Sequence, residues 1–351
     1  MSSTIRVLIA DDSPTMLKMY AALLSSAPDI QVVGTAKDGA EALELARTLH
    51  PDVITLDVRM PRMDGIEASS RIMSEAPSRI LVISGAVDAE MSFKALQAGA
   101  LEVMPKPRPN LEGLANFGVK LIHIIRTMAE LPVSQRPASA EPTSAQASRA
   151  APVLQGGRVN GFGLVASTGG PPALCHLLSL LPPKLPYPIF IAQHVSDGFT
   201  AGLCQWLGAA SSLRLEVAQT GVRPQPGYVY LPPDGHQLQV MLTGELLVEP
   251  IPTGKAALGD TLLASLALGY GNRAAGAVLT GMGSDGAAGL LAIRRAGGQT
   301  FAQSPESCVV PGMPEAALRN GATDTVLSLE ALASAMRSLT GAAPPTSTVR
   351  N

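Results

Sequence analysis

Short apolar runs alternate with segments of helical period along most of this 351-residue chain. Within residues 1–129, the runs IRVLIA, VITLDV and RILVIS alternate with helical patterns such as EALELARTL and GVKLIHIIRTM. Apolar runs of strand length that alternate with helical patterns are typical of βαβ units, in which parallel strands form one sheet. We therefore predict a first α/β domain over 1–129, with a doubly wound parallel sheet.

The alternation stops over 130–159, where the sequence is rich in Pro, Ala, Ser and Gln, and we predict a flexible linker there. It resumes in GFGLVAS, PALCHLLSLL and YPIFIAQHV, which predicts a second doubly wound α/β domain over 160–340. Residues 216–250 combine alternating apolar residues with frequent Gly and Pro, and we expect them to form hairpins inserted in that sheet. Residues 341–351 are expected to be a disordered tail.

Composition and charge exclude several classes of partner. The length suits two domains, and the 46% hydrophobic fraction suits soluble domains with well-filled cores. A net charge of -2 provides no general attraction to nucleic acid or to anionic lipid, so we expect neither as a partner. The N-terminus has acids where a signal peptide needs apolar residues, and no apolar run could span a bilayer, so we expect a cytoplasmic protein. Three widely separated cysteines are expected to be reduced core residues: Cys175, Cys204 and Cys308.

Polar side chains follow four predicted strands of the first domain. Asp11 and Asp12 end the first strand, Asp57 ends the third, Ser84 ends the fourth, and Lys106 follows the fifth. The carboxyl ends of parallel strands meet along one edge of a sheet, so these side chains should gather there. Three converging carboxylates repel one another, and Mg²⁺ relieves that repulsion while leaving one carboxylate as a phosphoryl acceptor. Lys106 and the Ser84 hydroxyl would then hold phosphate oxygens.

Each short motif also has a plainer explanation. The Asp pair could belong to a helix N-cap ahead of Ser13 and Pro14, and the Lys-Pro dipeptide could be an ordinary loop. Their joint order at successive strand ends favours the phosphoryl site.

The segments VLIADDS, LDVRMPRMDG, VISGA and MPKP resemble a response-regulator receiver domain over its whole length, a flavodoxin-like fold. The resemblance implies that Asp57 is the phosphorylated aspartate and that Asp11 and Asp12 help it to bind Mg²⁺. It also implies that Ser84 is the switch hydroxyl, that Lys106 contacts the phosphate, and that a chemosensory histidine kinase is the phosphodonor.

The second domain carries a candidate nucleophile and base. LVASTGGPPA indicates a strand, a tight turn and a helix N-terminus, with Ser167 at the turn. The amides of Thr168, Gly169 and Gly170 could then point at a developing negative charge. A hydroxyl needs a base to become a good nucleophile, and His194 ends the next predicted strand, FIAQHV, at the same edge.

A carboxylate should complete the set by fixing the imidazole tautomer, and Asp285 in AVLTGMGSDGAAG ends a later predicted strand. The alternatives are that Ser167 is only an N-cap, that Asp285 is a turn residue, and that His194 is structural. The remaining histidines are expected on the surface or in packing roles: His50, His123, His176 and His236.

The order Ser, His, Asp differs from that of α/β-hydrolases, and ASTGG is not their G-x-S-x-G elbow. The series ASTGGP, AQHV, GFT, LTGMGSDGAAGL, AIRRAGG, FAQ and SCVVPGMP resembles the chemotaxis protein-glutamate methylesterase (CheB) catalytic domain over nearly all of 161–339. The resemblance implies a three-layer α/β/α domain with a β-hairpin insertion. It implies these roles: nucleophile Ser167, general base and then acid His194, orienting carboxylate Asp285, and oxyanion donors the backbone amides of Thr168 and Met282.

The resemblance further implies a phosphorylation-activated esterase that hydrolyses glutamate γ-methyl esters, and deamidates glutamines, on methyl-accepting chemoreceptors. Mg²⁺ is expected for receiver phosphorylation and no cofactor for ester hydrolysis. We expect a monomer in which the unphosphorylated receiver limits access to the catalytic edge.

Three positions depart from the family patterns. Val103 stands where many receivers have an aromatic switch residue, and Val165 stands where the esterases often have glycine. A stretch that is commonly R-P-S-V-D reads Ala256, Ala257, Leu258, Gly259 and Asp260, so only the aspartate is kept. Loss of the cationic residue is expected to alter recognition near the cleft.

Other function classes stay open from the sequence. The second domain could be a non-catalytic binding module, or the esterase could serve a chemosensory pathway other than flagellar motility. A DNA-binding regulator is disfavoured because the second domain has no basic helix-turn-helix pattern.

Overall fold

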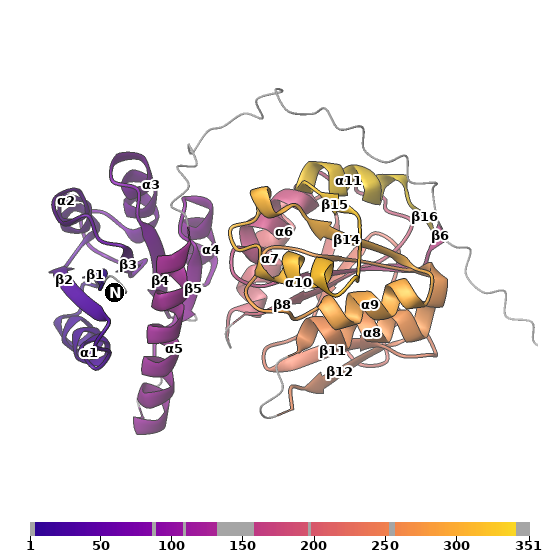
Figure 1. Ribbon diagram of the computed structural model, residues 1–351, viewed down its shortest axis with the longest axis horizontal. Helices are drawn as coiled ribbons and strands as arrows, with labels where there is room; N and C mark the ends of the chain where they lie inside the picture. The colour runs from indigo at the N-terminus through magenta and orange to yellow at the C-terminus, as the bar shows by residue number, and fades with distance from the viewer. Residues whose placement is uncertain are drawn as a thin grey trace, which may run out of the picture. The chain divides into compact units, whose positions relative to one another are not determined.

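The computed structural model describes residues 4–85, 89–107, 110–131, 158–195, 198–252 and 257–341. The chain divides into two compact units, and each is built around its own parallel sheet (Figure 1). No helix within these ranges combines the length and apolarity needed to cross a membrane.

The first unit contains a five-stranded parallel sheet in the order β2-β1-β3-β4-β5. Its strands are β1 (Ile5–Ala10), β2 (Ile30–Ala36), β3 (Val53–Leu56), β4 (Arg79–Ser84) and β5 (Glu102–Pro105). Its helices are α1 (Pro14–Ser25), α2 (Gly39–Leu49), α3 (Gly65–Glu75), α4 (Ala89–Gln97) and α5 (Leu111–Glu130). Helices α1 and α5 cover one face of the sheet, and α2, α3 and α4 cover the other (Figure 1).

Sequence explains these elements locally. All four residues of β3 are buried, as expected for a strand covered on both faces. Ser13, Asp38, Asp64 and Asn110 cap α1, α2, α3 and α5 by accepting hydrogen bonds from amides of the first turn. Strand order reverses between β1 and β3, so the crevice where α/β sheets bind ligands lies at the carboxyl ends of those two strands.

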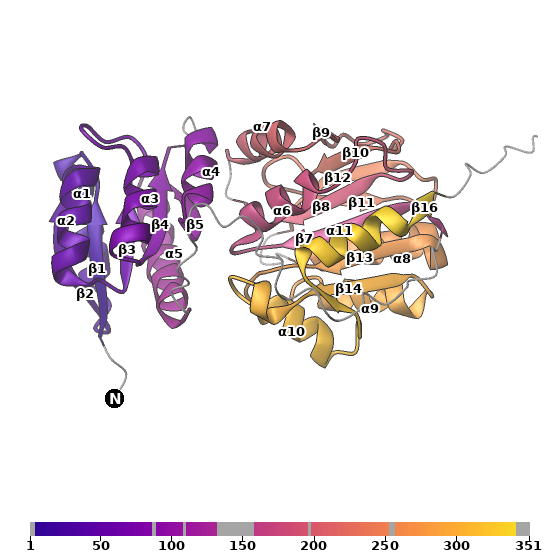
Figure 2. The same ribbon diagram turned by 90° about the horizontal axis from the view of Figure 1, so that it is seen from above.

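The second unit contains a seven-stranded sheet in the order β15-β14-β13-β7-β8-β10-β9. The strands from β14 to β9 can be followed in Figure 2, and β15 is labelled in Figure 1. Every strand pair in it is parallel. The strands are β7 (Gly161–Ala166), β8 (Ile189–Gln193), β9 (Arg214–Val217), β10 (Tyr228–Leu231), β13 (Ala274–Val278), β14 (Gln299–Gln303) and β15 (Val326–Leu327). The helices are α6 (Gly170–Ser179), α7 (Thr200–Ala210), α8 (Leu258–Tyr270), α9 (Ala287–Arg295), α10 (Gly312–Arg319) and α11 (Leu329–Ser338), with 3₁₀ turns η2 (Gly271–Arg273) and η3 (Pro305–Ser307).

Helices α8 and α9 pack on one face of this sheet, and α6 and α11 pack on the other (Figure 1). The expected three-layer α/β/α architecture is therefore present. Strand order reverses between β7 and β13, which places the ligand-binding crevice of this unit at their carboxyl ends.

The prediction of several hairpins inserted in the main sheet was wrong in part. One antiparallel hairpin is present, β11 (His236–Val240) with β12 (Leu246–Pro250), and it forms a separate two-stranded sheet. Strands β9 and β10 instead join the main sheet in parallel. The physical reason is that YVYL in β10 is a continuous, largely buried apolar run, as parallel strands require, whereas HQLQV in β11 alternates.

The structure also bears on the ends of the expected linker and tail. Helix α5 continues to Glu130, and β6 (Arg158–Val159) pairs with β16 (Thr340–Gly341). The two ends of the second unit are thereby tied together. Residues 132–157 and 342–351, which make up most of the predicted linker and tail, lie outside the described residues.

Candidate active sites

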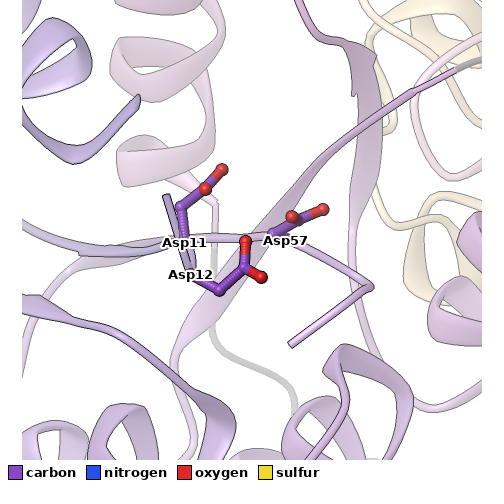
Figure 3. Close-up of side chains that lie close together, drawn as sticks. All are labelled: Asp11, Asp12 and Asp57. Carbon is purple, nitrogen blue, oxygen red and sulfur yellow. The ribbon is translucent and has the colours of Figure 1, made fainter. Parts of the chain in front are cut away.

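Three carboxylates gather at the switch point of the first sheet. Asp11 and Asp12 follow β1, Asp57 follows β3, and their ligand oxygens lie within 4.8 Å of one another (Figure 3). Asp11 and Asp57 are buried, and Asp12 is exposed. Such a set of hard oxygen ligands suits a divalent cation such as Mg²⁺.

Lys106 joins this cluster. Its Nζ lies 2.7 Å from Asp57 Oδ2 and 3.0 Å from Asp11 Oδ2. Burial would lower the pKa of Lys106, but contact with Asp57 and Asp11 outweighs it, and the pKa is raised. Burial raises the pKa of Asp57 despite the lysine. Three carboxylates gather around one ammonium, so a net negative charge remains that a bound cation would offset.

The expected switch hydroxyl is available for a new oxygen partner. Ser84 ends β4, is fully buried, and its Oγ has no hydrogen-bond partner within the described part of the chain. An orphaned buried hydroxyl at the carboxyl end of β4, the strand beside β3, suits a hydrogen bond to a phosphate oxygen. Val103 lies in β5, half-buried, where it pairs with Val82 of β4.

In the second unit, Ser167 directly follows β7 and is half-buried. Its amide donates to the Thr280 carbonyl at 3.0 Å, and its own carbonyl accepts from the Gly170 amide at 2.7 Å. Gly169 has a φ of 74°, and an added Cβ would lie 2.6 Å from Val309, so glycine is required at this turn. The expectation that the Gly170 amide could face an oxyanion was wrong, because that amide closes the turn.

His194 and Asp285 lie together at the same sheet edge. His194 follows β8, and Ala166 pairs with Gln193 in the β7–β8 register, so Ser167 and His194 occupy the next adjacent positions. His194 Nε2 lies 3.0 Å from Asp285 Oδ2, within ion-pair distance but not aligned as a hydrogen bond. No hydrogen bond joins Ser167 Oγ to the imidazole among the described residues. Catalytic hydrogen bonds often tighten only when substrate binds.

Asp285 does not end a strand as expected. It lies in the loop between β13 and α9, next to Gly286, the N-cap of α9. Its Oδ2 accepts from the Gly259 amide at 2.8 Å, and its Oδ1 accepts from the Asp260 and Gly286 amides, each at 2.9 Å. Burial would raise the pKa of Asp285, but contacts with His194 and with the amides of Gly259 and Asp260 lower it overall. The carboxylate is therefore held ionised and fixed in orientation.

Asp260 is a site residue whose role the sequence left unassigned. It lies in the first turn of α8, and its Oδ1 accepts from the Gly289 amide of α9 at 2.8 Å. Neither α8 nor α9 has a capping side chain at its own N-cap position. A carboxylate beside the other helix instead caps each one. Asp285, just before α9, accepts hydrogen bonds from two amides of α8, and Asp260 of α8 accepts one from an amide of α9. The one available signal was that Asp260 alone is kept in an otherwise altered stretch.

Two residues that depart from the family pattern, Val165 and Gly259, lie next to each other. A Cβ on Gly259 would lie 2.3 Å from Val165 Cγ1 and 3.1 Å from Asp285 Oδ2. Val165 is fully buried, so its side chain occupies space that a larger residue at 259 would need. Of the remaining altered residues, Leu258 is buried and Ala257 is the N-cap of α8, whereas Ala256 lies outside the described residues.

The residues of both expected oxyanion donors lie close to Ser167. Thr168 follows it, and its carbonyl accepts from Thr280 Oγ1 at 3.0 Å. Met282 lies beyond β13 and follows Gly281. A Cβ added to Gly281 would come 2.8 Å from Ser167 Cβ, so this loop passes close to Ser167. Within the described ranges, the amides of Thr168 and Met282 donate to no other protein group. Both are free to bind a ligand oxygen.

The other histidines and the cysteines have structural surroundings. His176 Nε2 lies 2.8 Å from Glu330 Oε1 on the surface, and His236 Nδ1 lies 2.7 Å from the Asp234 carbonyl oxygen. His50 is the C-cap of α2, and His123 lies on α5. The cysteines are unbridged, but Cys175 alone is fully in the core, since Cys204 and Cys308 are half-buried.

Comparison with known proteins agrees with this two-part architecture. The response regulator receiver domain family matches residues 7–115, and the CheB methylesterase family matches residues 162–336. A Myxococcus xanthus protein named protein-glutamate methylesterase/protein-glutamine glutaminase 3 is 50% identical over 333 residues, which cover 93% of this chain and 92% of that protein. The chain belongs to the CheB methylesterase family.

A second relative spans nearly the whole chain, and one solved catalytic domain spans about half of it. An Anaeromyxobacter dehalogenans protein of the same name is 41% identical over 335 residues, which cover 94% of this chain and 97% of that protein. The crystal structure of the Thermotoga maritima CheB methylesterase catalytic domain is 31% identical, with a TM-score of 0.48, and covers 51% of this chain and 97% of that one. Membership of the CheB family identifies the chain as a hydrolase with a receiver domain.

Proposed function

We propose that this CheB protein hydrolyses glutamate γ-methyl esters on methyl-accepting chemoreceptors, with Ser167 as nucleophile, His194 as base and Asp285 as the orienting carboxylate. The observation that carries the proposal is the 3.0 Å approach of His194 to Asp285 beside the strand end that bears Ser167. A base oriented by a half-buried carboxylate next to a hydroxyl on a tight turn is the arrangement that acyl transfer by serine requires.

The chemistry begins with transfer of the Ser167 proton to the imidazole. Because Nε2 faces Asp285, Nδ1 is the ring nitrogen left to accept that proton. Ser167 Oγ adds to the ester carbonyl carbon, and the amides of Thr168 and Met282 bind the oxyanion. The C–O bond to the methoxy group then breaks, and the imidazolium proton leaves with methanol.

Water completes the turnover. The imidazole takes a proton from water as the hydroxide oxygen adds to the acyl carbon, and collapse of this second adduct returns the proton to Ser167 Oγ. The receptor keeps a glutamate carboxylate. Deamidation of glutamine follows the same route with ammonia as the leaving group, and the relatives named above carry both activities in their names.

Methanol release from methylated receptor membranes tests the proposal. We expect Ser167→Ala to abolish release, because no other group in the proposed mechanism can form the acyl intermediate. Ser179→Ala is a matched control at the far end of α6, where the hydroxyl only donates to the His176 carbonyl. Full release by Ser167→Ala would instead favour a non-catalytic signalling role for the second unit.

A further inference from the structure

The two expected oxyanion donors are the amides of Thr168 and Met282, and each shares a peptide unit with the carbonyl of the residue before it. Both of these carbonyls, Ser167 and Gly281, accept hydrogen bonds. In a trans peptide the C=O and the next N–H point in opposite directions, and no peptide bond in the described structure is cis. The Gly281 carbonyl accepts from the Met313 amide at 3.0 Å, which turns the Met282 N–H the other way. The Ser167 carbonyl likewise determines where the Thr168 N–H points.

A side chain, Gln193, holds the Ser167 carbonyl. Gln193 Nε2 lies 3.0 Å from the Ser167 carbonyl and 3.0 Å from the His194 carbonyl. With the Gly170 amide at 2.7 Å, the Ser167 carbonyl therefore accepts two hydrogen bonds. The side-chain amide of Gln193 cannot be flipped by 180°, because Oε1 would then face the two carbonyl oxygens that Nε2 now contacts.

The surroundings of Gln193 are built to keep this geometry. The side chain is 6% exposed and ends β8, and its Oε1 has no hydrogen-bond partner among the described residues. A Cβ on Gly170 would lie 2.0 Å from that Oε1. A buried polar group that lacks a partner carries a free-energy cost, so the hydrogen bonds of Gln193 that offset its burial are the two made by Nε2.

We propose that Gln193 is a positioning residue of the esterase site. Its amide fixes the plane of the Ser167–Thr168 peptide, so that the Thr168 N–H faces the developing oxyanion, and it ties the backbone of His194 to the same point. This inference rests on the proposed function. Gln193 touches neither the substrate nor the reacting atoms, and it acts through Ser167, Thr168 and His194.

Gln193→Met tests this role, because methionine matches the length of glutamine but cannot donate. Loss of a single oxyanion donor costs about 10²–10³-fold in kcat, and a donor that is only misaimed should lose part of that. We expect kcat for methyl ester hydrolysis to fall about 10- to 100-fold while KM changes by less than about 3-fold. A role limited to stability would leave kcat per folded molecule unchanged.

Ser265→Ala is the matched control. Ser265 is buried in the same unit, and its Oγ donates to the Leu262 carbonyl and accepts from the Val240 amide, away from the sheet edge. We expect this variant to lose stability in thermal unfolding while keeping kcat. If Gln193→Met does not fold, Gly170→Ala serves instead, because its Cβ displaces the Gln193 side chain without removing it.

The outcomes separate the two proposals. A folded Gln193→Met or Gly170→Ala variant with wild-type kcat, alongside an inactive Ser167→Ala, would overturn the role of Gln193 and leave the esterase proposal intact. An active Ser167→Ala would overturn the esterase proposal itself.

Discussion

Among single residues, Asp285 is held more firmly than orientation of one imidazole requires. Both of its oxygens accept backbone amides, from Gly259, Asp260 and Gly286, and Oδ2 also faces His194. Each amide hydrogen bond to a carboxylate is charge-assisted, so together they oppose rotation of the side chain. The lowered pKa of Asp285 keeps the group ionised at neutral pH.

We expect Asp285→Asn to lower kcat on the order of 10³- to 10⁴-fold, by analogy with the same change in serine proteases, because an amide in this place favours the wrong imidazole tautomer. Stability should fall by about 1–3 kcal/mol, because the new NH₂ group would face backbone N–H donors. Methanol release and denaturant unfolding measure the two effects. Wild-type kcat in this variant would exclude Asp285 as the orienting residue.

The stability effect has a defined pH dependence. Because the pKa of Asp285 is lower in the folded chain than in the unfolded chain, its contribution is present above about pH 4 and is lost as the pH falls through the folded pKa. The difference in unfolding free energy between wild type and Asp285→Asn should therefore shrink below about pH 4.

Between elements, the site depends on the close approach of the N-termini of α8 and α9. Asp285 caps α8 and Asp260 caps α9, so movement of either helix would move the carboxylate that faces His194. Burial and the nearby Asp285 raise the pKa of Asp260, although its backbone donors partly oppose them. The approach is possible because position 259 is glycine against Val165.

Exchanging the side chains at positions 165 and 259 tests whether these two positions are energetically coupled. Gly259→Val alone should destabilise the protein by about 1–3 kcal/mol through overpacking against Val165 and Asp285. Val165→Gly alone should also destabilise it, by leaving a cavity. The double variant should recover at least half of the summed loss in urea unfolding. Additive losses would show that the two positions are not coupled.

Across the whole molecule, each unit places its polar cluster at the point where the strand order of its sheet reverses. Asp11 and Asp57 follow β1 and β3 in the first unit, and Ser167 follows β7, beside β13, in the second. We propose that Mg²⁺ bound by the aspartates supports phosphoryl transfer to Asp57 and that phosphorylation raises the esterase rate. A hollow of about 480 Å³ opens beside the cluster, lined by Asp12, Val58, Arg59, Met60, Pro61, Asp64 and Met91.

A small phosphodonor such as acetyl phosphate tests this control. With Mg²⁺ present, we expect it to increase methanol release, and we expect either chelation of Mg²⁺ or Asp57→Asn to remove the increase. Asp29→Asn is the control, because Asp29 only pairs with Arg126 on the surface. Equal rates with and without phosphodonor in the wild type would argue against control by the receiver.

The sequence predicted the positions of site residues that directly follow strands. It did not predict positions and roles that depend on contacts between distant segments. Asp11, Asp57, Ser167 and His194 could be placed because each directly follows an apolar run, and parallel strands end at one edge. Asp285 was named from the sequence, but its expected place at a strand end was wrong, because it lies in a loop well past β13 and is held there by amides of α8. The role of Asp260, the contact between Val165 and Gly259, and the bridge formed by Gln193 likewise join segments far apart in the chain.

If Ser167 is a nucleophile activated by His194, it should react with a probe that modifies activated serines. A fluorophosphonate probe bonds covalently to an activated serine, and peptide mass spectrometry then locates the adduct. We predict a single adduct on Ser167 that forms far more slowly in His194→Ala. An adduct elsewhere, or unchanged labelling of Ser167 without the imidazole, would contradict the account.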